Sequence, residues 1–247
     1  MFISSEFLAV NYGVDDKIAR FFVDREPPAD NLYWKGKLLY LRPAPGYLFI
    51  PLIVDLLFKL GIDRQQLLSE EFVATMEQVG HISALEETRQ ISDNEAIKKC
   101  AELVKETCRN KDWLNDLVDY LNHRKVNFFS RLSSPFKALH RGDVFLFAVC
   151  SLEFPSELHE KIAEQWFALI STLLLLDDAE DIEADKETGD ANAFLESGLN
   201  TEGIHKIKKL VSQNLEKIRV INPTMAFQLN MQYNENIEKP VLLSVKK

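Results

Sequence analysis

An apolar segment that ends abruptly in a dense run of acids is the feature that most constrains the fold of this chain. Residues 166–176 read WFALISTLLLL, and only Ser171 and Thr172 among them are polar. A run of this kind has no polar stripe, so it predicts a helix buried on nearly all sides, at the centre of a helical bundle. The next segment, 177–192, reads DDAEDIEADKETGDAN. Its eight acids and one base give a net charge of −7, out of −9 for the whole chain.

The spacing of these acids suggests a cation site. If the helix continues, Asp177, Asp181 and Asp185 fall at i, i+4 and i+8 on one face. Like charges at this spacing repel one another, and the helix macrodipole disfavours anions near a C-terminus. Mg²⁺, which binds through carboxylates and substrate phosphates, is the natural candidate for neutralising them. A solvated acidic surface at the end of a helix is the alternative interpretation, and the sequence leaves it open.

Composition bounds the class of protein. With 9 Gly and 9 Pro in 247 residues, long stretches are free of helix breakers, and we predict one all-α domain over 1–247. The architecture expected is an orthogonal or antiparallel helical bundle. An isoelectric point near 5.2 argues against nucleic acid as the main partner. The sequence is compatible with a homodimer and does not fix the oligomeric state.

The cellular location is predicted from the absence of a membrane span, a signal peptide and a disulfide pattern in the sequence. The apolar segment 48–62 contains Pro51, Asp55 and Lys59, so no membrane span is expected there. The N-terminal segment has neither the basic region nor the cleavage site of a signal peptide. The three cysteines form an odd set without a CxxC motif, so we expect reduced thiols and a cytoplasmic protein.

Helices account for most of the chain in this interpretation. One or two short helices are predicted in 1–26 and end at Pro27-Pro28. A short hairpin or an irregular cap is predicted near 32–41. Further helices are predicted at 50–60, 64–79, 82–90, 93–109, 112–131, 135–150, 155–185, 201–219 and 223–236.

The acidic segment resembles the second metal-binding motif of the class I isoprenoid synthases, the superfamily of prenyl diphosphate synthases and terpene cyclases. Residues 177–181, DDAED, match the DDxxD of the prenyl synthases. The i, i+4 and i+8 aspartates, followed by Lys186 and Gly189, match the ligand spacing of the cyclases. The resemblance implies a terpenoid-synthase-like bundle that binds a prenyl diphosphate. It also implies Mg²⁺ ligands at Asp177, Asp178, Asp181 and Asp185, with Lys186 contacting the diphosphate.

The same superfamily carries a first aspartate-rich motif, for which the best match is NDLVDYLNHRK at 115–125. The resemblance implies that Asp116 and Asp119 are further metal ligands and that Arg124 and Lys125 contact the diphosphate. The other interpretation is a plain solvent-facing side of an amphipathic helix, where an Asp-x-x-Asp pair is common.

Helix packing decides whether the two acidic segments can share one site. If 112–131, 135–150 and 155–185 alternate in direction, the first and third are parallel. Asp116 and Asp181 would then lie about 30 Å apart at 1.5 Å per residue. The two segments could meet only if one helix ran unbroken from about 93 through 125.

Two functions therefore remain in view, and the sequence identifies no catalytic residue for either. The first is a Mg²⁺-dependent isoprenoid synthase-like protein that binds a prenyl diphosphate. The second is a non-catalytic all-α binding module for a lipid-like or protein partner. A large apolar cavity beside the acids favours the first, and a filled core favours the second. Seven phenylalanines could line a pocket or simply pack the core: Phe128, Phe129, Phe136, Phe145, Phe147, Phe154 and Phe167.

Overall fold

Helices and their connections make up all of the chain that the computed structural model describes, namely residues 4–26, 28–31 and 49–237. No strand occurs within these ranges, so the all-α prediction is confirmed for them. The hairpin predicted near 32–41 lies outside the described residues. Within the same ranges, no helix is both long and apolar enough to cross a membrane.

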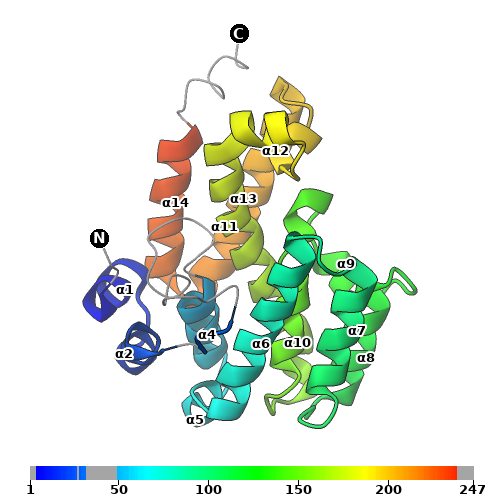
Figure 1. The fold of residues 1–247 in the computed structure, drawn as a ribbon. Helices are drawn as coiled ribbons and strands as arrows, with labels where there is room; N and C mark the ends of the chain where they lie inside the picture. Colours follow the sequence, from blue (N-terminus) through cyan, green and yellow to red (C-terminus); the bar gives the residue numbers. More distant parts are fainter. Residues whose placement is uncertain (1–3, 27, 32–48, 238–247) are drawn as a thin grey trace.

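The helices follow one another with short connections (Figure 1). The first group is α1 (Ser5–Tyr12), α2 (Asp16–Asp24), α4 (Phe49–Lys59), α5 (Arg64–Leu67), α6 (Glu70–Glu87), α7 (Asp93–Val104), α8 (Lys111–Leu121) and α9 (Phe128–Leu132). The second group is α10 (Leu146–Val149), α11 (His159–Thr188), α12 (Ala193–Glu196), α13 (Thr201–Ile221) and α14 (Pro223–Ile237). The described residues also form short 3-10 helices. Two lie between α9 and α10, η2 (Lys137–His140) and η3 (Asp143–Phe145), and η4 (Ser156–Leu158) lies between α10 and α11.

Helix α11 is the centre of the molecule, as its unbroken apolar run predicts. It is 30 residues long, and its buried side chains extend from Ile162 to Ile182. Helix α13 lies along it, and α4, α9 and α14 also pack against it (Figure 1). A cluster of buried side chains runs from Leu8 to Tyr233 and contains most of the buried residues of α11. Helix α11 has 16 buried residues, more than any other described helix, so the prediction for 160–178 holds by number; by fraction, the shorter α4 is more buried, with 9 of 11 residues.

Four predicted helices do not form as separate continuous elements: 64–79, 82–90, 112–131 and 135–150. The segment 112–131 is divided, because α8 ends at Leu121 and His123 adopts a positive φ of 54°. Asn127 then caps α9 by accepting the N–H groups of Phe129 and Ser130. The segment 135–150 forms η2, η3 and α10 instead of one helix. The carboxylate of Glu196 accepts the backbone N–H groups at the start of η2, and this contact from a distant element favours a tight turn.

Serine caps set the starts of α6 and α7, and the first of them divides a predicted helix. Ser69 caps α6 through the N–H of Phe72, so the predicted helix 64–79 is split into α5 and α6. Helix α6 then runs on to Glu87 and absorbs most of the predicted helix 82–90. Ser92 and Glu95 form a complete capping box at the start of α7.

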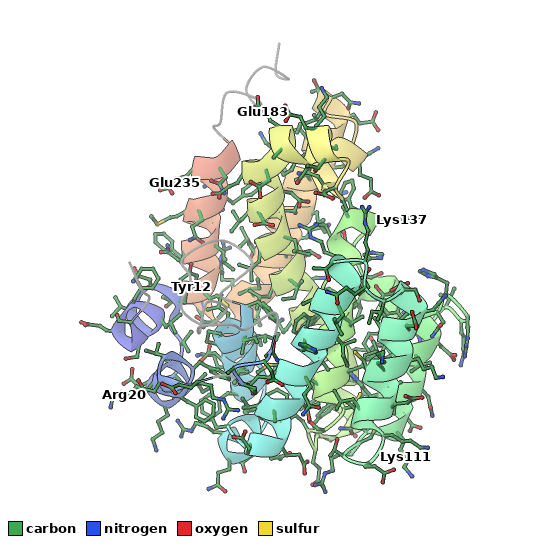
Figure 2. The ribbon with its side chains drawn as sticks, in the orientation of Figure 1. Tyr12, Arg20, Lys111, Lys137, Glu183 and Glu235 are labelled. Atoms are coloured by element: carbon green, nitrogen blue, oxygen red, sulfur yellow. The ribbon has the colours of Figure 1, made fainter. Side chains whose placement is uncertain are left out.

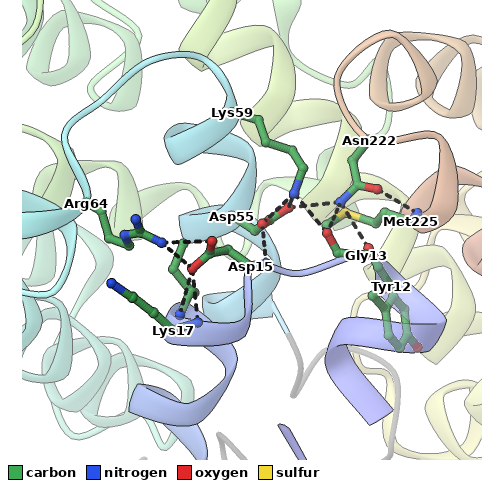
Figure 3. A network of polar contacts seen from close by, with 10 residues as sticks. Tyr12, Gly13, Asp15, Lys17, Asp55, Lys59, Arg64, Asn222 and Met225 are labelled. Atoms are coloured by element: carbon green, nitrogen blue, oxygen red, sulfur yellow. Dashed lines mark hydrogen bonds and ion pairs between the residues drawn. The ribbon is translucent and has the colours of Figure 1, made fainter. Parts of the chain in front are cut away.

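A buried polar network fastens the N-terminal helices to the rest of the fold (Figure 3). Asp55 of α4 is fully buried and receives both a 2.6 Å ion pair from Lys59 and the N–H of Asp15 at 2.8 Å. The side-chain amide of Asn222, which precedes α14, donates to Asp55 at 2.8 Å and to the carbonyl of Tyr12 at 2.9 Å. The network thus joins the α1–α2 turn, α4 and the α13–α14 turn.

Candidate functional site: the acidic end of α11

Three aspartates share one face of α11 near its C-terminal end. Asp177 and Asp185 are half-buried, and Asp181 is exposed. Figure 2 shows this end of the helix at the top of the molecule, where Glu183 is labelled. The helix ends at Gly189, which takes the left-handed conformation with φ of 77°.

The charges on this face act on one another. Burial raises the pKa of Asp177 to about 6, the negative charges of Asp181, Asp178 and Asp185 raise it as well, and Arg141 lowers it. The Asp177 side chain is nevertheless 39% exposed, so water screens part of this repulsion. The face is an anionic row that its one close guanidinium does not fully balance.

Asp178 has a different role from its neighbours, because its side chain is only 1% exposed and both of its oxygens are engaged. One oxygen accepts from Arg141 at 2.5 Å, and the other accepts the N–H of Ala193 at 2.7 Å. The amide of Asn192 adds bonds of 2.8 Å to the Asp178 carbonyl and to the Asp185 carboxylate. Asp178 therefore anchors the connection between α11 and α12.

Arg141 is the residue of this site that the sequence interpretation missed. It follows η2, donates to the carbonyl of Ala138 at 2.6 Å and stands 3.7 Å from the Asp177 carboxylate. The next residue is Gly142, where an added Cβ would lie only 3.1 Å from the Ile170 side chain. The glycine lets this turn approach α11 closely, which brings Arg141 to the acids. The Arg141-Gly142 pair is a sequence signal for a turn. The prediction of a continuous helix at 135–150 did not take this signal into account.

The first aspartate-rich segment lies at the other end of α11. The ring of Trp113 in α8 contacts that of His159, the first residue of α11, at 5.6 Å between centroids. Burial lowers the pKa of His159, and the nearby charges of Asp112 and Asp116 oppose that shift, so Asp116 lies close to this end. Asp181 is 22 positions further along the helix, or about 33 Å. In Figure 2, Lys111 at the start of α8 and Glu183 of α11 are at opposite ends of the molecule.

The predicted basic residues are divided in the same way. Lys186 is exposed in the last turn of α11, on the helix that carries the acids. Arg124 and Lys125 are exposed in the α8–α9 connection. Arg124 and Asp119 both line a groove between α7 and α8, and the N–H of Arg124 donates to the Asp119 carbonyl at 2.9 Å. The structure therefore keeps Arg124 with the first acidic segment.

The seven phenylalanines pack the core. Six of them are buried, and only Phe128 is partly exposed. The rings of Phe129 and Phe154 meet Trp113 edge-on at centroid distances of 4.8 and 5.6 Å, and Phe167 meets Phe129 at 6.4 Å. Side chains fill this part of the interior, as expected for ordinary core packing.

A buried carboxyl group beside α11 is a second polar feature that the sequence did not reveal. Asp143 in η3 is 1% exposed and accepts a 2.6 Å hydrogen bond from the hydroxyl of Tyr120. Burial raises the pKa of Asp143 to about 6. Its second oxygen makes no hydrogen bond of normal geometry to any described residue, although the Trp166 side chain is near enough to lower the pKa of Asp143. Asp143 therefore makes the free energy of unfolding depend on pH. Because it lies inside the core, it is not part of the acidic site at the end of α11.

Neither the arrangement of possible metal ligands nor comparison with known proteins assigns a function to this site. Among the described residues, no group of three or more His, Cys, Asp or Glu side chains is arranged to hold a metal ion. No family model, no curated protein and no solved structure matches the chain. The proposal for function therefore rests on the geometry of the site itself.

Proposed function

We propose that the acidic end of α11 binds Mg²⁺ together with a diphosphate ester, in an isoprenoid synthase-like protein whose ligand is a prenyl diphosphate. The observation that carries this proposal is the row formed by Asp177, Asp181 and Asp185, in which burial, and to a smaller extent mutual repulsion, raises the pKa of Asp177 to about 6. A divalent cation relieves that repulsion. Because Mg²⁺ commonly takes only one or two carboxylates and completes its shell with phosphate and water, a cluster of three preformed ligands is not required.

The contacts divide the roles among the residues of this site. Asp177 and Asp181 are the proposed ligands of the cation, and Asp185 supports them while it accepts from Asn192. Asp178 is excluded from the ligand set because its oxygens hold Arg141 and the N–H of Ala193. Its role is to position Arg141, which is 28% exposed beside Asp177 and complements the charge of a diphosphate.

The cation, when bound, would neutralise the phosphate charge and stabilise a departing diphosphate. The protein's own contribution is to hold Asp177 and Asp181 one turn apart on a rigid, buried helix. Arg141 adds a positive charge from a separate turn. Lys186, on the same end of α11, is a further candidate contact for phosphate oxygens.

A second candidate function is binding without turnover of a lipid-like or protein partner. Two observations favour it. The seven phenylalanines pack the core instead of lining a cavity. Asp116 lies near the first residue of α11, about 33 Å along the helix from Asp181. Catalysis that uses two facing carboxylate clusters needs both at one site, and Asp116 and Asp119 are too distant to supply the second.

Ligand-induced stabilisation tests the binding proposal. Thermal unfolding would be followed with Mg²⁺ alone, inorganic diphosphate alone, and both together. We expect the combination to stabilise the protein by about 2.7 kcal/mol at a hundredfold excess over the dissociation constant. Asp181→Asn should abolish this shift, and Asp116→Asn, at the distant acidic segment, is the matched control that should keep it. Equal behaviour of the two variants, or no shift in the parent protein, would contradict the proposal.

Turnover distinguishes the two candidate functions. The protein would be incubated with geranyl or farnesyl diphosphate and Mg²⁺, and released diphosphate would be measured. Release that is lost in Asp181→Asn supports an enzyme. Stabilisation by the ligands without release supports the binding module.

A further inference from the structure

Two of the three cysteines, far apart in the sequence, meet in the fold. Cys108 lies in the connection between α7 and α8, and Cys150 follows α10. Their side chains are close enough for each thiol to affect the pKa of the other. The sequence alone predicts three separate reduced thiols, because a separation of 42 positions conceals the pair.

Hydrogen bonds join the two segments that carry Cys108 and Cys150. The N–H of Arg109 donates to the carbonyl of Cys150 at 2.8 Å. The side-chain amide of Asn110 donates to the carbonyl of Leu152. Two successive residues of one segment are therefore fastened to the other segment. These contacts keep the backbones at Cys108 and Cys150 close together.

The two thiols differ in access and in acidity. Cys108 is partly exposed, whereas Cys150 is fully buried. A hydrogen bond from the Cys150 thiol lowers the pKa of Cys108 to about 6, with help from the N–H of Asn110 and the charge of Lys111. Burial raises the pKa of Cys150. A partly exposed thiolate next to a protonated thiol is the arrangement of an attacking cysteine and its resolving partner.

We propose that Cys108 is an oxidation site and that Cys150 resolves it, so that a peroxide converts the pair into a reversible disulfide. The Cys108 thiolate attacks one oxygen of hydrogen peroxide and the O–O bond breaks. The hydroxide that leaves takes up a proton to give water, and Cys108 becomes a sulfenic acid. The Cys150 sulfur then attacks the sulfenic sulfur, and the thiol proton leaves with the sulfenic hydroxyl as a second water. Two electrons pass from the two thiols to the peroxide.

Cys100 provides an internal comparison. It is fully buried in α7, and burial raises its pKa to about 12. It therefore lacks both the access and the acidity of Cys108. A general oxidant that acts on cysteines without regard to their surroundings would not distinguish the two, whereas the proposed site selects Cys108.

Peptide mapping tests the disulfide directly. Trypsin would place the cysteines in three different peptides: 100–105, 106–109 and 142–161. The reduced full-length protein would be treated with hydrogen peroxide, alkylated and digested without reductant. We expect the peptide 106–109 linked to 142–161, with the link removed by dithiothreitol. Cys100→Ala, the matched control, should give the same link.

The outcome in Cys150→Ala separates a resolving role from simple proximity. Without Cys150, Cys108 should proceed to sulfinic and sulfonic acid instead of forming a link. In the parent protein, alkylation of Cys108 should be half-maximal near pH 6, and in Cys150→Ala it should move toward the ordinary thiol value of about 8.5. Absence of the 106–109 to 142–161 link in the folded parent protein, or a link to Cys100, would overturn the proposal. Both parent-protein measurements remain decisive if the variant does not fold.

Discussion

Replacement of Arg141 by methionine removes the positive charge that is ion-paired with buried Asp178, while keeping a side chain of similar length. Asp178 is 1% exposed, so its carboxylate would keep the N–H of Ala193 and lose its counter-charge. Breaking a buried ion pair from one side costs about 3–5 kcal/mol. Because Arg141 itself is 28% exposed, water can replace part of the pair. We therefore expect a loss of about 3 kcal/mol at neutral pH, at the lower end of that range.

The cost should depend on pH in a defined direction. Burial raises the pKa of Asp178 and Arg141 lowers it, so loss of Arg141 raises that pKa further. An acid whose pKa is higher in the folded state takes up a proton on folding. Its folded form is therefore favoured as pH falls and disfavoured as pH rises through the folded pKa. The destabilisation by Arg141→Met should be largest at about pH 7 and smaller at about pH 5, where Asp178 can be protonated.

Urea unfolding followed by circular dichroism at both pH values measures this effect. Arg131→Met is the matched control, because Arg131 pairs with Glu160 at 2.8 Å while both side chains are 64% exposed. An exposed pair of that kind is worth less than about 1 kcal/mol. The reasoning is refuted if Arg141→Met costs no more than Arg131→Met, or if its cost is the same at both pH values.

Three further predictions concern buried polar groups and the N-terminal turn. Burial raises the pKa of Asp143 to about 6, so its carboxyl group destabilises the folded state as pH rises through 6. Asp143→Asn should weaken this dependence, which is measured as the change in the free energy of unfolding in urea between about pH 5 and 7. Asn222→Ala removes a donor to buried Asp55 and should cost about 2–3 kcal/mol in the same assay. Gly13→Ala should destabilise more than Gly61→Ala by thermal unfolding. Both glycines have positive φ, but a Cβ at Gly13 lies 2.9 Å from neighbouring side chains and one at Gly61 meets nothing within 4 Å.

The parts of the fold that sequence predicts well depend on local signals. The apolar run at 166–176 has no polar stripe, and the helix that contains it is the buried centre of the bundle. Ser69 and Ser92 cap helices as their spacing to the next residues suggests, because a hydroxyl reaches an N–H three positions away whatever the tertiary structure.

The parts that sequence did not predict depend on contacts between distant segments. No glycine or proline marks the end of α8, and the break is made by a positive φ at His123. Arg141 reaches Asp178 from a turn that is stabilised by Glu196. The approach of Cys108 to Cys150, 42 positions away, is equally non-local. Periodicity carries no information on such pairs, so the candidate site could be placed on its helix while its guanidinium could not be identified.

The amide of Asn222 has a consequence for the order in which the chain folds. It donates hydrogen bonds to the carbonyl of Tyr12, 210 positions away, and to the carboxylate of Asp55, 167 positions away. During synthesis from the N-terminus, α1, α2 and α4 are complete long before this amide exists. Until it emerges, a carboxylate destined for full burial lacks one of its donors. Closing contacts at such separations is entropically costly and slow. We therefore expect the N-terminal helices to dock late on the ribosome, after α13 is made, and not to serve as an early folding nucleus.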